Sequence, residues 1–99
     1  PRPLQDDDGN TRIHRAAELH PPVLIGRGVS VAAGCRIGPH TVIGDGSRIL
    51  SKAVLKNCIL FDKVFVSRNV HLSNCIIGAA GSVNENITAY EGAVLNIRQ

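Results

Sequence analysis

Four histidines are the side chains in this 99-residue chain best suited to catalysis: His14, His20, His40 and His71. An imidazole can act as a general base near neutral pH, and three imidazoles that converge can hold a zinc ion. His40, in the string GPHTVIG, is the strongest candidate for a base. The same position also suits a surface corner, because histidine tolerates left-handed backbone.

Three cysteines could form a disulfide or bind a metal, and they are Cys35, Cys58 and Cys75. An odd number leaves one unpaired, and their spacing matches no zinc pattern. We therefore expect reduced packing residues in a cytoplasmic setting, with a bridge between Cys58 and Cys75 left open. The run Asp6 to Asp8 could attract a divalent cation, but we assign it to a polar linker over residues 1–12.

Composition excludes several classes of partner. The net charge is only +3, and the basic residues are spread along the chain without interleaved aromatics, which make up 3%. Nucleic-acid binding requires a concentrated basic face, so we expect none. No stretch approaches the roughly 20 apolar residues that a membrane span needs, so we expect no membrane contact either.

The element that must position these side chains is a six-residue repeat. Aliphatic residues recur almost every sixth position from Ile13 to Leu95, with glycine or asparagine three residues later in many repeats. A helix would show a period near 3.6 and a flat strand a period of 2, whereas hexads are typical of a parallel β-helix. We therefore predict an all-β domain over residues 13–99, with four to five triangular coils.

Three hexads make one coil, so the repeats can be stacked. One predicted column of inward residues contains Ile25, Ile43, Leu60, Ile77 and Leu95. Spacings of five instead of six follow Leu55 and Leu72, which puts both in one column. A second inward series, four residues after the first, contains Cys35, Thr41, Ser47, Ile59 and Ile76.

The stacking also predicts surface contacts. Glu18 falls beside Arg36, and Arg27 beside Asp45. His14 and His20 are one hexad apart and so lie on different faces, which argues against a shared zinc ion.

The candidate interaction surface is apolar. Phe61 and Phe65 occupy outward slots in which neighbouring coils carry small or polar residues, and Leu50 and Val54 lie on the adjacent face one coil earlier. Exposed aromatic clusters on a rigid scaffold are typical of protein contacts. We expect these four residues to contact another subunit or another domain.

Several strings resemble a known family: PPVLIGRGV, CRIGPHTVIGDGSRI, NCILFDKVFV and HLSNCIIG. They are similar to the carboxy-terminal left-handed β-helix of sugar-1-phosphate nucleotidylyltransferases, especially the mannose-1-phosphate guanylyltransferase-like branch. The resemblance implies a left-handed coil with an oligomerising or regulatory task, in a sugar-nucleotide-forming enzyme whose catalytic domain lies outside this chain. It also implies that Mg²⁺ belongs to that domain, and that the partners are the catalytic domain and a homo-oligomer, either trimer or dimer.

The resemblance assigns no catalytic, cofactor-binding or metal-binding residue to this chain. The alternative is a fragment of a hexapeptide-repeat acyltransferase, in which a histidine acts as general base in a cleft between subunits. Such enzymes usually interrupt the coil with a long loop for the acyl donor. Here the repeat never shifts by more than one residue, which favours the first interpretation.

Overall fold

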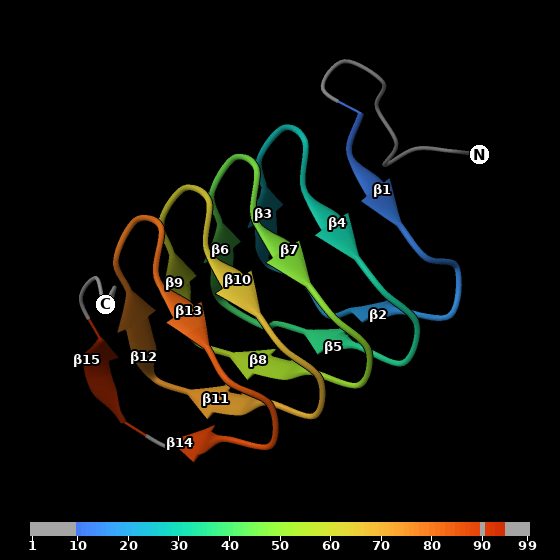
Figure 1. The fold of residues 1–99 in the computed structure, drawn as a ribbon. Coiled ribbons are helices and arrows are strands. Elements are labelled where there is room, and N and C mark those ends of the chain that lie inside the picture. Colours follow the sequence, from blue (N-terminus) through green and yellow to red (C-terminus); the bar gives the residue numbers. More distant parts are fainter. Residues whose placement is uncertain (1–9, 90, 95–99) are drawn as a thin grey trace.

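The chain forms a left-handed parallel β-helix of five triangular coils, as predicted (Figure 1). The structure is a computed structural model and describes residues 10–89 and 91–94. The strands are β1 (Arg12–Ile13), β2 (Glu18–Leu19), β3 (Val23–Ile25), β4 (Ser30–Val31), β5 (Arg36–Ile37), β6 (Thr41–Ile43), β7 (Arg48–Ile49), β8 (Val54–Lys56), β9 (Ile59–Leu60), β10 (Phe65–Val66), β11 (His71–Ser73), β12 (Cys75–Ile77), β13 (Ser82–Val83), β14 (Thr88–Ala89) and β15 (Gly92–Val94).

Each side of the triangle is a five-stranded parallel sheet with one strand from every coil. Sheet A has the order β1-β4-β7-β10-β13, sheet B the order β2-β5-β8-β11-β14, and sheet C the order β3-β6-β9-β12-β15. Consecutive coils are in register, so residues at equivalent positions lie side by side. The figure shows β1 and β15 at opposite ends of the stack.

The core is a pile of aliphatic side chains along the coil axis. The most completely buried large ones include Ile37, Ile43, Ile49, Leu55 and Leu60, all at most 1% exposed. The pairings Ile25 with Ile43, Ile43 with Leu60 and Leu60 with Ile77 confirm the predicted column.

Two polar side chains share this interior, and both have hydrogen-bond partners. Ser47 is fully buried; its hydroxyl donates to the Phe61 carbonyl at 3.2 Å and accepts from the Val64 N–H at 3.1 Å. The Thr41 hydroxyl donates to the Pro39 carbonyl at 3.1 Å. Buried polar groups are tolerated when they are paired in this way.

The five-residue spacings arise at the corner between sheets B and C. In the second coil this corner contains His40, with φ of 53°, and in the next two coils a single asparagine with φ of 57° turns the chain, Asn57 and then Asn74. Asparagine suits this conformation because its short polar side chain reduces the cost of left-handed backbone. The shorter corner therefore removes one residue without disturbing the strands.

The structure corrects the second inward series beside these corners. Ile59 and Ile76 point outward and are each 41% exposed, while Cys58 and Cys75 take the buried positions. The residue is lost from the corner and not from the strand, so side chains still alternate along the strand. Cys58 and Leu60 therefore face inward, and Ile59 faces outward.

The last coil contains a third short corner, which the sequence analysis missed. Ile77 pairs with Val94, and not with the predicted Leu95, which lies outside the described residues. Gly92, which follows the aliphatic position Ala89 by three residues in the hexad pattern, begins β15. At the other end β1 begins at Arg12, within the expected linker of residues 1–12, and Asp6 to Asp8 also lie outside the described part.

Candidate functional site

The four histidines lie at different places on the coil. His14 and His20 follow β1 and β2 in the first coil, His40 is in a corner of the second, and His71 points outward from β11 in the fourth. His14 Nδ1 accepts a hydrogen bond from the Ala16 N–H at 2.9 Å. Within residues 10–89 and 91–94, no three His, Cys, Asp or Glu side chains are grouped closely enough to hold a metal ion.

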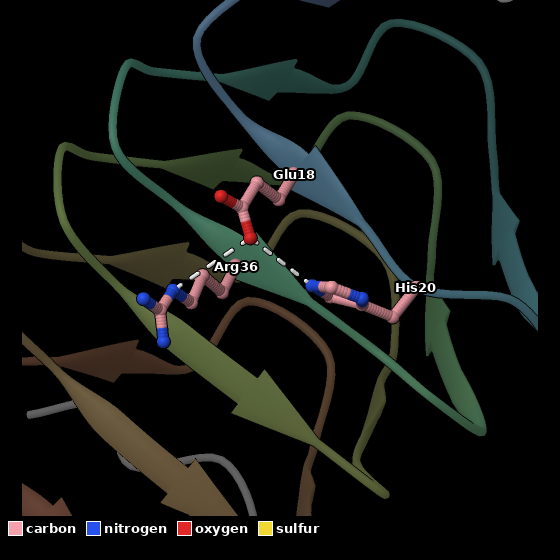
Figure 2. A network of polar contacts seen from close by, with 3 residues as sticks. All are labelled: Glu18, His20 and Arg36. Atoms are coloured by element: carbon pink, nitrogen blue, oxygen red, sulfur yellow. Dashed lines mark hydrogen bonds and ion pairs between the residues drawn. The ribbon is translucent and has the colours of Figure 1, made fainter.

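His20 belongs to a small polar network on sheet B. Glu18 Oε1 lies 3.2 Å from His20 Nε2 and 3.8 Å from Arg36 Nε, as Figure 2 shows. All three side chains are more than half exposed, so these contacts are weak. The predicted contact between Glu18 and Arg36 is confirmed, and it ties the first coil to the second.

Arg27 and Asp45 also meet as predicted, but through the backbone. Asp45 Oδ1 accepts a hydrogen bond from the Arg27 backbone N–H at 2.9 Å.

A polar hollow of about 410 Å³ opens at the corner between sheets B and C, lined by Pro39, His40, Lys56, Asn57, Ser73 and Asn74. The only ring that could act as a general base in this lining is His40, and no acidic side chain lies there to orient it.

All three cysteines are free and buried. Cys58 and Cys75 occupy equivalent positions in neighbouring coils, as predicted, because Ile59 pairs with Ile76. Burial raises the pKa of the Cys35 and Cys58 thiols, since the thiolate form would lose its hydration. A raised thiol pKa and burial both oppose nucleophilic chemistry.

The four predicted interface residues are divided among faces. Phe61 is 50% exposed at the end of β9 in sheet C, whereas Phe65 points outward from sheet A and is partly buried. Val54 lies on sheet B, partly buried, and Leu50 precedes the corner between sheets A and B. The structure therefore does not bring these four residues into one patch.

A more continuous apolar surface covers the outer face of sheet C. Its outward side chains Leu24, Val42, Ile59 and Ile76 are 68%, 37%, 41% and 41% exposed. They pair in register, Leu24 with Val42, Val42 with Ile59 and Ile59 with Ile76, so they form one unbroken row. We call this row the sheet C ladder.

The ladder was not predicted from the sequence because the hexad pattern assigns Ile59 and Ile76 to the interior, whereas both are 41% exposed. The ladder can be identified from the residue directly before the buried aliphatic residue of each sheet C strand. Side chains alternate along a strand, so this residue points outward. In the other sheets that position is charged or polar in most coils, as with Glu18 and Arg36 in sheet B and Arg48 in sheet A. In sheet C it is aliphatic in every one of the first four coils.

The chain is similar to solved acetyltransferases with the same architecture. It matches the acetyltransferase domain of PglB from Neisseria gonorrhoeae FA1090 with a TM-score of 0.61 and 25% identity, over 88% of this chain and 49% of that one. It also matches a perosamine N-acetyltransferase mutant from Caulobacter crescentus with a TM-score of 0.55 and 21% identity, over 80% and 50% respectively. The chain thus spans about half the length of these structures, and the likeness shows the fold.

The comparison with protein families covers almost the whole coil. The family model described as the GMPPB C-terminal domain matches residues 8–97, which include every strand from β1 to β15. Among residues 10–89 and 91–94 there is no helix long and apolar enough to cross a membrane. The chain belongs to the GMPPB C-terminal domain family.

Proposed function

We propose that this β-helix is the oligomerising or regulatory domain of a sugar-nucleotide-forming nucleotidylyltransferase. The observation that carries the proposal is the sheet C ladder, a row of exposed aliphatic side chains on a rigid face. Contiguous exposed apolar patches on soluble proteins mark interaction sites. Membership of the GMPPB C-terminal domain family supports the same conclusion.

The chemistry of the parent enzyme belongs to a domain outside this chain, where we expect Mg²⁺ to assist attack of a sugar phosphate on a nucleoside triphosphate. The coil contributes an ordered scaffold. From Arg12 to Val94 no connection between consecutive strands exceeds four residues, so the faces are set by the coil itself. Such a scaffold can hold catalytic domains in fixed relative positions.

The alternative function is an acyltransferase, which the solved acetyltransferases of this architecture favour. Against it, the short connections between strands offer no long loop for an acyl donor. The two functions separate in a direct assay. The full-length protein should form a sugar nucleotide from a sugar phosphate and a nucleoside triphosphate. It should neither hydrolyse acetyl coenzyme A nor transfer its acetyl group.

The domain's own role is tested by removing it. A full-length protein from which residues 13–99 are deleted should sediment as a smaller assembly than the intact protein, while its catalytic domain still binds nucleotide. An intact assembly after the deletion would refute the oligomerising role. Acetyl transfer that is lost when His40 is changed to Ala would instead establish the acyltransferase.

A further inference from the structure

The sheet C ladder differs in charge from the other two faces of the prism. The outward rows of sheets A and B include Arg12 and Arg48, and Glu18, Arg36 and His71. The sheet C row has no charged residue from β3 to β12. A two-fold contact between two copies places the same patch on both sides, so a face with an excess of one charge would repel its copy, whereas a neutral apolar face would not.

The ladder is also flat and unobstructed along one edge. The residues that follow the first four strands of sheet C, β3, β6, β9 and β12, are Gly26, Gly44, Phe61 and Gly78, so three of these four carry no side chain. Glycine is required at Gly44, where an added Cβ would lie 2.6 Å from the Phe61 carbonyl oxygen. Phe61, half exposed, is the one bulky residue at this edge.

A flat sheet face is complemented best by another flat sheet face, because side chains of two aligned sheets interdigitate at about 10 Å separation. Five strands about 4.8 Å apart give a face roughly 20–25 Å long, and the coil is about 20 Å across. Two such faces would bury roughly 800–1,000 Å² in total, which is below the size of stable specific interfaces and within the range of weak, transient ones. That size fits a reversible, concentration-dependent dimer.

We infer that the sheet C ladder is the surface through which two copies of this chain pack face to face. The inference rests on the proposed oligomerising function and names the face and the partner that perform it. Leu24, Val42, Ile59 and Ile76 supply the apolar contact, and Phe61 extends it at the edge.

The test compares one substitution on two faces. Val42→Glu alters sheet C, and Val54→Glu alters the equivalent outward position of sheet B, where Arg36 and His71 are its register neighbours. Sedimentation velocity over a wide concentration range should show at least about a tenfold weaker dimer for Val42→Glu and an unchanged dimer for Val54→Glu. Circular dichroism and thermal unfolding show that both variants remain folded.

A second measurement needs no substitution. The methyl NMR signals of Leu24, Ile59 and Ile76 should shift as the wild-type chain is concentrated, while those of Val54 stay in place. Equal dimerisation of wild type and Val42→Glu, with unmoved ladder methyls, would overturn the sheet C assignment and leave the oligomerising function standing. A wild-type chain that stays monomeric would overturn the pairing of two copies, and an effect of Val42→Glu on the full-length assembly would then assign the face to another domain.

Discussion

The carboxylate of Asp62 accepts a hydrogen bond from the backbone N–H of Asp45, one coil earlier, at 2.9 Å. Asp45 does the same for Arg27 at 2.9 Å, so the corner between sheets C and A carries a ladder of two carboxylates. Gly44 makes room for it, because an added Cβ there would lie 2.5 Å from Asp62 Oδ1. Each carboxylate fixes the turn of the preceding coil.

Replacing Asp62 with Ala should destabilise the domain through this contact. A hydrogen bond to a charged group contributes about 1.5–3 kcal/mol, and the exposed position of this contact favours the lower end of that range. Urea unfolding should therefore show a lower free energy of unfolding. Glu85→Ala, which removes only the exposed ion pair with Arg68, is the control and should change less. Equal losses in the two variants would contradict the role of the carboxylate ladder.

Ser47→Ala should cost more than its small change in volume suggests. The substitution leaves the buried Val64 N–H without its 3.1 Å partner. An unsatisfied buried donor costs about 1–3 kcal/mol. Thermal or urea unfolding measures the loss, with Ser82→Ala on the exposed face of sheet A as control. A variant as stable as this control would show that the Ser47 hydroxyl is dispensable.

The stability of the domain should fall in alkaline solution partly because of Cys35. Burial raises the pKa of this thiol above its unfolded value, about 8.5. The contribution is complete below the unfolded pKa and is lost as the pH rises toward the folded pKa, because the unfolded chain then releases the proton first. Melting temperatures should therefore fall less steeply above about pH 8.5 for Cys35→Ala than for the wild type. Parallel pH profiles would argue against this linkage.

Substitution of the two phenylalanines separates the surface expected from sequence from the sheet C ladder. Phe61→Ser should weaken self-association because Phe61 borders the ladder, whereas Phe65→Ser on sheet A should leave it unchanged. The double variant should then behave like Phe61→Ser alone. Sedimentation measures the association, and retained β-sheet circular dichroism confirms folding. A dominant effect of Phe65 would move the interface to sheet A.

The sequence was sufficient for the fold because the buried positions obey a strict spatial rule. Branched aliphatic side chains fill most of the narrow axis of the coil, so Ile25, Ile43 and Leu60 reveal the stack through their spacing alone. The corner that absorbs a missing residue was harder to locate. Spacing shows that one residue is lost between Leu55 and Leu60, but not whether the corner or the strand loses it.

That ambiguity explains why the sheet C ladder was not predicted. Once Ile59 and Ile76 are assigned to the interior, the outward row of sheet C loses two of its four aliphatic members, and the phenylalanines appear to be the main exposed apolar residues. The orientation of strands follows only when the left-handed residues Asn57 and Asn74 are placed. The backbone conformation at these two corners thus determines which side chains of sheet C face outward.

Because the coils stack in register, the length of the domain is a whole number of strand spacings. Every coil places its three strands directly beside those of the previous one, so each added or deleted coil would change the length by one strand spacing, about 4.8 Å. The distance between a group held near β1 and a group held near β15 can therefore change only in steps of one coil.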